Sequence, residues 1–506
     1  MAGRHPSATA LVTGAAALVA AAVAALQLTR PGQLPGTSYD TAVFLGGAIR
    51  LVHGAVPYRD FAFVQPPGLL LLLSPFGLLS ELVGTRLALD ALILCTPLLA
   101  AANVVLVGRL LRHRGWTACL AGCGLLAVYP AVFFALRDGM VEPVMDLCCL
   151  VGLCLAFRED RLAGPRRLIL GGVALGVAAT VMLPGLIPAL AVAAVAARHP
   201  RRGLLPLAGG LAAGVGVPSL PFALLSPGGF VDGVFVSQLA RVPDAARQPL
   251  SLRAVDLTVG GGQGWTVVVV AVVILAAIAL VAVSGLLVPP RRRLPALEWF
   301  ALGAAAAMLA AQFVTSQYFP HYPAMVAPFL AVLLGISAGR LAAWRLPRLL
   351  PAAVTGFALW LLAAQVVGVE GLVSVRVSAA AVDAVVPAGA CAVADRTYLL
   401  VGSDRFVSTR PGCPELVDPR GTVYANAETP GGAAAAFGAA ITGADYVVVD
   451  MSLDQWLPGA AYAPVRADVA EQFHLVRSGR LYCYVRDGFA AAATPAAGAG
   501  TARSAS

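Results

Sequence analysis

The sequence contains no lysine, and charged residues of any kind are scarce. Only 12% of its 506 residues are charged and 59% are hydrophobic, and the mean hydropathy is +0.82. A soluble domain carries about 25% charged residues, so this composition excludes an ordinary soluble enzyme and indicates a protein that crosses a bilayer many times. No basic arm or patch with interleaved aromatic residues accompanies the net charge of +9. We therefore expect no nucleic-acid partner.

Cysteines with metal-ligand spacing are also missing. Six of the nine cysteines lie in apolar runs, where they serve as small packing residues, and no CxxC pair has flanking histidines. The other three, Cys391, Cys413 and Cys483, fall in a polar C-terminal region. One disulfide among them is compatible with a location outside the cytoplasm, and the sequence does not choose the pair.

In place of charge the sequence has long apolar segments. A span needs about 20 apolar residues, and eleven segments are predicted to cross the membrane: 8–28, 86–108, 116–136, 143–157, 168–183, 185–197, 204–225, 266–288, 296–313, 323–340 and 349–369. The stretch 68–82 is shorter, follows Pro66-Pro67 and contains Pro75. It is predicted to be an interfacial or re-entrant helix rather than a span.

Arginine clusters predict the orientation of these segments. The clusters lie at 109–114, 158–167, 198–202, 291–293 and 340–348, and short loops rich in arginine favour the cytoplasm. All five fall on that side if the N-terminus is cytoplasmic and the C-terminus is outside. The predicted fold is an α-helical polytopic membrane protein with about 11 spans in residues 1–370.

A different composition follows the last apolar segment. Residues 391–394, 398–401, 446–450 and 480–485 have the pattern of short strands, and 433–442 has that of a helix. We expect a small extracytoplasmic α/β domain over residues 371–487. Small and polar residues dominate 488–506, which predicts a disordered tail.

The first outward loop begins with Tyr39-Asp40 and continues through Asp60 to Gly68. Asp40 is predicted to lie between the first span and an interfacial helix over 41–52. A carboxylate between a low-dielectric medium and water is suited to accept a proton. The alternative is a structural role, because aspartate is also a preferred N-cap residue.

Two further outward segments carry acids and arginines. The first contains Arg137, Asp138 and Glu142, with Asp146 one turn deeper inside the predicted span. An ionisable residue within a span indicates function by default, although Asp146 could equally pack helices through an internal hydrogen bond. The second segment contains Gln238, Arg241 and Arg253. Arginine suits phosphate oxygens, but loop arginines are commonly only solvated.

The last outward loop contains His321-Tyr322-Pro323. These rings could line a sugar or phosphate site, or they could only anchor the chain at the membrane interface. Together these segments indicate a functional site, because all of them are predicted to lie on the same side of the membrane.

In this order the segments resemble the GT-C superfamily of membrane glycosyltransferases, which use polyprenyl-phosphate sugars. The resemblance covers roughly residues 8–370. It rests on Tyr39-Asp40, on the loop from Gly54 to Gly68, on Arg137 to Glu142 and on His321-Tyr322-Pro323. It implies that Asp40 is the catalytic base, with Asp60 a weaker candidate. It further implies a set of residues that bind substrate: Tyr39, Asp60, Arg137, Asp138, Glu142, Gln238, Arg241, Arg253, His321 and Tyr322.

The activity implied is transfer, with inversion, of mannose or arabinofuranose from a polyprenyl-phosphate donor to an extracytoplasmic glycan, lipid or protein. No cofactor is required by the residues. Tyr39 stands where the family usually has a second acid, so metal dependence stays open, with Asp138 and Glu142 the candidate ligands for Mg²⁺ or Mn²⁺. The alternatives are a transporter or flippase, and a non-catalytic protein that anchors the C-terminal domain.

Overall fold

The computed structural model describes residues 7–28, 38–239, 249–258, 265–287, 294–315, 318–344, 355–359, 379–427, 429 and 431–491. Arg241, most of the predicted span 349–369 and residues 492–506 of the predicted tail lie outside the described residues. The chain forms two compact units. The helical unit comprises Met1–Leu34, Gln65–Leu73 and Asp90–Ser374, and the mixed unit comprises Pro35–Val64, Ser74–Leu89 and Val375–Ser506.

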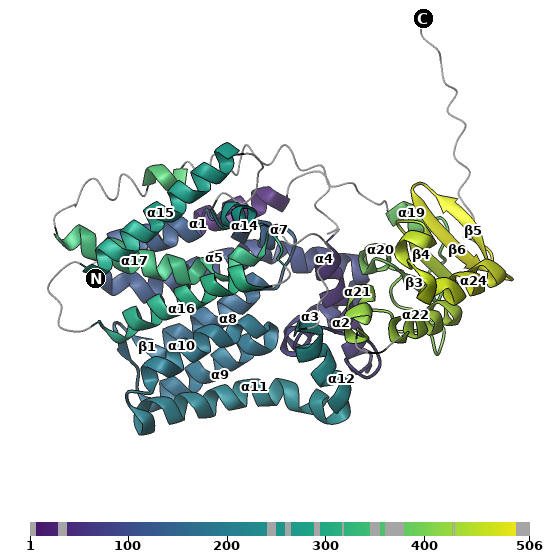
Figure 1. The fold of residues 1–506 in the computed structure, drawn as a ribbon, viewed down its shortest axis with the longest axis horizontal. Coiled ribbons are helices and arrows are strands. Elements are labelled where there is room, and N and C mark those ends of the chain that lie inside the picture. Colours follow the sequence, from purple (N-terminus) through teal and green to yellow (C-terminus); the bar gives the residue numbers. More distant parts are fainter. Residues whose placement is uncertain are drawn as a thin grey trace, which may run out of the picture. The chain divides into compact units, whose positions relative to one another are not determined.

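The helical unit is built almost entirely from apolar helices, several of which run side by side in Figure 1. They are α1 (Ala8–Leu28), α5 (Thr96–Leu111), α6 (Trp116–Leu126), α7 (Pro130–Arg137), α8 (Glu142–Ala156), α9 (Pro165–Val181), α10 (Leu186–Ala196), α11 (Leu205–Leu225), α12 (Pro227–Val231), α13 (Ser237–Leu239), α14 (Leu250–Thr258), α15 (Trp265–Leu287), α16 (Ala296–Val314) and α17 (Ala327–Trp344). Helices α3 (Gly68–Val83) and α4 (Thr85–Leu94) each have residues in both units.

Glycines allow α9 and α11 to pack backbone against backbone. A Cβ at Gly210 would lie 2.0 Å from the carbonyl oxygen of Ile169, and one at Gly214 would lie 2.2 Å from that of Val173. Such contacts stabilise helix pairs in lipid, where apolar side chains gain little by leaving the bilayer. Leu18 and Leu98 are each 73% exposed, as expected of side chains that face lipid.

By length and composition, four described helical segments could cross a membrane: Ala8–Leu28, Thr85–Arg114, Pro200–Leu225 and Ala296–Val314. The pair α6 and α7, bent by 48°, would form a fifth span. Other predicted spans coincide with shorter helices, such as α8 with 15 residues and α10 with 11. The number of eleven spans therefore stays a prediction. The stretch expected to be re-entrant is α3, a helix of 16 residues with Pro75 inside it.

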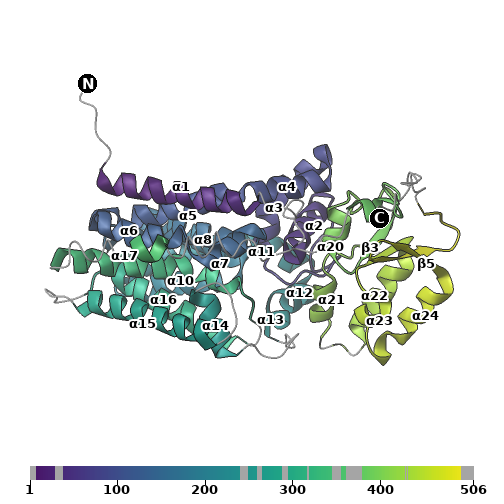
Figure 2. The same ribbon diagram turned by 90° about the horizontal axis from the view of Figure 1, so that it is seen from above.

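The mixed unit contains a four-stranded sheet in the order β3-β4-β6-β5. Its strands are β3 (Ala392–Ala394), β4 (Tyr446–Val449), β5 (Phe473–Ser478) and β6 (Leu481–Arg486), and its helices include α2 (Tyr39–Val52), α19 (Ala379–Asp383), α20 (Thr397–Val401), α21 (Pro419–Ala425), α22 (Gly432–Gly443), α23 (Leu453–Trp456) and α24 (Ala463–Gln472). Strands β3 and β4 are parallel and the other pairs are antiparallel. Figure 2 shows α22, α23 and α24 together on one face of the sheet.

Three of the four predicted strands and the predicted helix are present as β3, β4, β6 and α22. The strand predicted at 398–401 is wrong, because these residues form helix α20. A short apolar run does not distinguish a buried strand from a buried helical turn. Strand β5 was not predicted; only its first residue is fully buried, so it lacks a clear apolar pattern.

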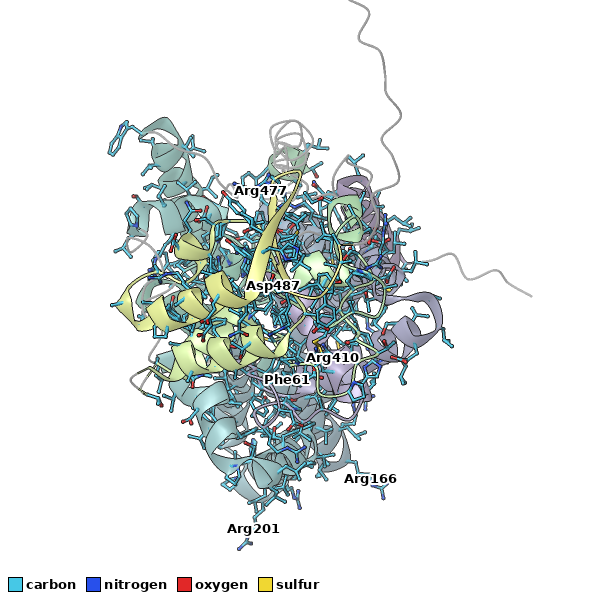
Figure 3. All side chains as sticks on the ribbon, turned by 90° about the vertical axis from the view of Figure 1, so that its right-hand side faces the viewer. Phe61, Arg166, Arg201, Arg410, Arg477 and Asp487 are labelled. Atoms are coloured by element: carbon cyan, nitrogen blue, oxygen red, sulfur yellow. A yellow bond between two sulfur atoms is a disulfide. The ribbon has the colours of Figure 1, made fainter. Side chains whose placement is uncertain are left out.

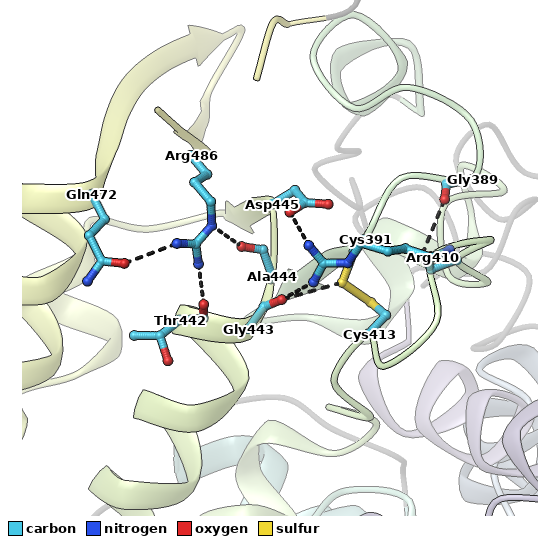
Figure 4. A network of polar contacts seen from close by, with 11 residues as sticks. Gly389, Cys391, Arg410, Cys413, Thr442, Gly443, Ala444, Asp445, Gln472 and Arg486 are labelled. Carbon is cyan, nitrogen blue, oxygen red and sulfur yellow. Dashed lines mark hydrogen bonds and ion pairs between the residues drawn. A yellow bond between two sulfur atoms is a disulfide. The ribbon is translucent and has the colours of Figure 1, made fainter. Parts of the chain in front are cut away.

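Two arginines and a disulfide hold the segment between α22 and β4. Arg486 donates to the carbonyl of Ala444 at 2.9 Å and to Gln472 at 3.0 Å, while Arg410 pairs with Asp445 (Figure 4). The disulfide joins Cys391 to Cys413. Cys483 is a free, buried thiol.

Candidate functional site

Helix α2 places Asp40 in its first turn. The helix begins at Tyr39 and the N-cap position is Ser38, so the alternative role of Asp40 as the capping residue is wrong. An acidic residue in the first turn interacts favourably with the positive end of the helix dipole. The Asp40 side chain is partly exposed, as a group that exchanges protons with a substrate must be.

The residue before Asp40 is held by the C-terminal part of the mixed unit. The Tyr39 hydroxyl donates a hydrogen bond to Asp418 at 2.8 Å and accepts one from the backbone N–H of Arg420, also at 2.8 Å. The guanidinium groups of Arg420 and Arg396 lie 5.0 and 5.8 Å from the centre of the Tyr39 ring. We call Tyr39, Asp418 and Arg420 the Tyr39 clamp. Burial and the neighbouring Asp418 carboxylate raise the pKa of Tyr39, so its hydroxyl stays protonated and able to donate.

A second contact holds the far end of α2. Arg50 donates to the carbonyl of Phe406 at 2.9 Å, lies 4.5 Å from the centre of that ring, and pairs with Glu415. A Cβ at Gly46 would lie 2.9 Å from the Phe406 ring, so the helix approaches this segment closely. Both ends of the helix that carries Asp40 are therefore bound to residues beyond 400.

Asp60, the weaker candidate for the base, lies within a tight turn of the first loop. It accepts hydrogen bonds from the backbone N–H of Val56 at 2.7 Å and from Arg59 at 2.9 Å. The hydrogen bond from Arg59 lowers the pKa of Asp60. A carboxylate with a lowered pKa is a poor proton acceptor, which favours Asp40.

Several predicted residues of the helical unit meet around the ring of Phe134. Arg137 lies 4.5 Å from the centre of this ring and pairs with Asp138 at 2.8 Å. The ring of His321 stacks with that of Phe134, with ring centres 6.3 Å apart, and its Nε2 lies 3.4 Å from the Glu142 carboxylate. The structure thus brings together two pairs of predicted residues through Phe134, which no sequence pattern marked.

Burial governs the chemistry of His321. It lowers the pKa of His321 to about 4, so the imidazole is neutral at neutral pH. Phe319 stacks against the same ring at 5.6 Å and Tyr322 meets it edge-on at 5.1 Å. A neutral imidazole beside buried Glu142 can donate or accept a hydrogen bond without introducing charge.

Arg253 is buried and forms hydrogen bonds within the helical unit. It is 2% exposed, and its Nη1 donates to the carbonyl oxygens of Gln312 at 2.9 Å and Thr315 at 3.0 Å. Gln238 lies on the short helix α13. Arg241 is outside the described residues.

Asp146 lies deep in the helical unit. It is 3% exposed and, together with Asn103, lines an internal cavity of about 10 Å³. Asn103 donates to the carbonyl of Pro143 at 3.0 Å, which connects α5 to the start of α8. This bond does not involve Asp146, so the functional and the helix-packing alternatives for Asp146 both stay open.

Within the described parts of the chain, no group of three or more His, Cys, Asp or Glu side chains could hold a metal ion. The candidate metal ligands Asp138 and Glu142 instead contact Arg137 and His321.

Sequence reasoning missed Asp418, Arg420 and Arg396. They lie more than 350 positions after Tyr39, and no local pattern marks them.

A comparison with protein-family models finds one match that covers half of the chain. Residues 63–316 match glycosyltransferase family 87. No curated protein matches.

Solved structures share the fold. ArnT from Cupriavidus metallidurans bound to undecaprenyl phosphate is similar with a TM-score of 0.58 and 14% identity, over 92% of this chain and 96% of ArnT. The Archaeoglobus fulgidus oligosaccharyltransferase in complex with Zn and sulfate has a TM-score of 0.54 and 14% identity, over 94% of this chain and 73% of its own. The arabinofuranosyltransferase AftD from Mycobacteria has a TM-score of 0.51 and 16% identity, over 93% of this chain and 40% of its own. At these identities the likeness is one of fold.

Proposed function

This chain belongs to glycosyltransferase family 87, and from that membership we propose that it transfers mannose or arabinofuranose from a polyprenyl-phosphate donor to an acceptor outside the cytoplasm. The acceptor is a cell-envelope glycan, lipid or protein. The fold shared with ArnT, whose structure holds undecaprenyl phosphate, supports a donor of this lipid class.

Asp40 is the proposed catalytic base. Its carboxylate takes the proton from an acceptor hydroxyl, and that oxygen attacks the anomeric carbon of the donor sugar. The bond from the anomeric carbon to the phosphate oxygen breaks on the opposite face, so the configuration inverts and polyprenyl phosphate leaves. One carboxylate is sufficient for this step, whereas glycoside hydrolysis usually uses two that flank the bond. The observation that carries the assignment is the Tyr39 clamp, which immobilises the helical turn that bears Asp40.

The leaving phosphate needs a compensating cation. Arg253 already donates to two carbonyl oxygens and is buried, so we assign this role first to Arg137 and then to Arg241. The pair with Asp138 orients Arg137. Glu142, His321, Tyr322 and Gln238 are proposed to bind donor or acceptor.

The proposed orientation has a cytoplasmic N-terminus and about eleven spans, with residues 371–487 outside. The Cys391–Cys413 disulfide supports this location of the C-terminal residues, because disulfides persist in oxidising compartments. Labelling of single cysteines introduced at positions 40 and 241 tests it: labelling from opposite sides of the membrane would contradict the site.

Sugar transfer from a polyprenyl-phosphate donor, measured in membranes, tests the base. Replacing a general base removes about 10²–10⁴-fold of the rate, so Asp40→Asn should lose that much while its expression stays normal. Asp60→Asn tests the weaker candidate for the base in the same assay and should lose less activity than Asp40→Asn. Full activity of Asp40→Asn would remove Asp40 from the mechanism.

A further inference from the structure

The helical unit contains a large hollow that none of the residues assigned above lines. It is lined by the β1–β2 hairpin (Phe157–Arg158 and Arg161–Leu162), by the residues that follow α10 and by the residues that precede α16. Its volume is about 1090 Å³. Pockets that bind small ligands occupy about 300–1,000 Å³, so the hollow can hold a headgroup-sized molecule.

Three arginines line this hollow. Arg158 and Arg161 come from the hairpin and Arg198 from the end of α10. Among the described residues, none of the three guanidinium groups has a carboxylate within ion-pair distance. We call this group the arginine hollow.

The acids nearby do not neutralise these arginines. Asp160 at the hairpin turn is 2.9 Å from His113 and also pairs with Arg114. Glu298 is fully buried and lies between Arg114, at 2.8 Å, and Arg340. Only Glu159, an exposed residue of the turn, is left in the lining to offset three positive charges.

An aromatic residue places the hollow at a membrane surface. The guanidinium of Arg198 lies 5.3 Å from the centre of the Trp299 ring, and Trp299 is 42% exposed. Exposed tryptophans near the ends of spanning helices mark the interface between lipid and water. In the proposed orientation this end of the helices faces the cytoplasm, where the leaflet carries anionic lipid.

We propose that the arginine hollow binds a phosphate group, presented by the headgroup of an anionic phospholipid or by a soluble phosphate. Arginine offers a planar set of donors that matches phosphate oxygens, and basic pockets between spanning helices bind anionic headgroups. Arginines collect in cytoplasmic loops for topological reasons alone. That tendency accounts for their presence, but not for the convergence on one hollow of three arginines that have no carboxylate partner among the described residues.

Two other arginines serve as controls for the general accumulation of arginine in cytoplasmic loops. Arg166 and Arg201 are exposed residues of the same clusters, and Figure 3 shows both extending outward from the molecule. Neither lines the hollow. Variants at these positions remove positive charge from the same side of the protein without altering the proposed site.

The experiment compares the full-length protein with the triple variant Arg158→Gln/Arg161→Gln/Arg198→Gln and the control Arg166→Gln/Arg201→Gln. Native mass spectrometry measures lipid retained from nanodiscs of phosphatidylcholine with and without phosphatidylglycerol. Phosphatidylglycerol should bind the triple variant about 100-fold more weakly than the wild type. Binding to the control should stay within about threefold of the wild type, because neither Arg166 nor Arg201 lines the hollow.

A second arm measures the binding of inorganic phosphate, added at millimolar concentration, to the wild type and to both variants. If the triple variant loses phosphate binding while the wild type shows no preference for phosphatidylglycerol, the hollow is assigned to a soluble phosphate instead of a lipid. Equal losses in both variants, or no loss in the triple variant, would overturn the proposal. Thermal unfolding of each variant verifies folding. Arg158→Lys/Arg161→Lys/Arg198→Lys keeps the charge but loses the planar donors, so it should bind more weakly than the wild type and more tightly than the glutamine variant. Neither arm depends on sugar transfer, so the proposed function can fail independently.

Discussion

Tyr39→Phe tests whether the C-terminal residues position the catalytic helix. The change removes only the hydroxyl, which donates to Asp418 at 2.8 Å and accepts from the Arg420 backbone at 2.8 Å. A hydrogen bond to a charged group contributes about 1.5–3 kcal/mol and a neutral one about 1 kcal/mol. Asp418 keeps its other donor, the N–H of Gly421 at 2.8 Å. We therefore expect the variant to lose about 2 kcal/mol of unfolding free energy.

The expected effect on activity is larger in turnover than in donor binding. Displacement of a catalytic group by about 1 Å can cost about 10²-fold in rate, so kcat should fall about 10- to 100-fold while the KM for donor changes little. The assay is sugar transfer in membranes, at several donor concentrations. Tyr462→Phe is the matched control, because the Tyr462 ring packs on Phe437 and its hydroxyl makes no hydrogen bond within the described residues.

A double-mutant cycle decides whether the clamp is one interaction. If Tyr39 acts through Asp418, the variant Tyr39→Phe/Asp418→Asn should be hardly worse than the poorer single variant. Asparagine at 418 remains a good N-cap for α21, so the helix start is retained. Wild-type kcat in Tyr39→Phe, or fully additive losses in the double variant, would refute the positioning role.

Three further outcomes are expected of the mixed unit, all measured by thermal unfolding of the full-length protein. Arg50→Met should destabilise it by about 2 kcal/mol, because Glu415 loses its partner in a partly buried site. Arg50→Met/Glu415→Gln should recover only the part due to that carboxylate, since the contacts of Arg50 with Phe406 stay lost. Burial and the neighbouring Asp450 raise the pKa of Asp395 to about 8; since the unfolded carboxyl ionises near about 4, stability should fall as the pH rises from about 4 to 8. Asp395→Asn should flatten that decline, and an unchanged slope would contradict it. Removal of the disulfide in Cys391→Ser/Cys413→Ser should cost about 3 kcal/mol, as expected for closing a loop with a sequence separation of 22. A loss well below 1 kcal/mol would mean that the reduced chain is already constrained there.

The sequence by itself determined the class of the protein and the positions of most elements. A bilayer requires long apolar helices, because backbone groups in lipid must form hydrogen bonds within the segment. That requirement is local, so apolar length predicted helices such as α1 and α11 nearly to their ends. Buried strands β3 and β4 are continuous apolar runs, and they were predictable for the same reason. Asp40 could be selected for a similar reason, because it lies between two segments that the sequence predicts, the first span and an interfacial helix.

Only the tertiary structure decided what holds Asp40 in place. Tyr39 and Asp418 are 379 positions apart, and Arg50 and Phe406 are 356 apart. Side-chain pairs at such separations leave no periodic signal, since each partner alone resembles an ordinary loop residue. The structure also distinguishes arginines that look alike in the sequence. Arg253 donates to carbonyl oxygens inside the fold, whereas Arg158, Arg161 and Arg198 line a hollow. Local pattern predicts which segments are buried, but the partner of a polar group depends on which distant segment the fold brings beside it.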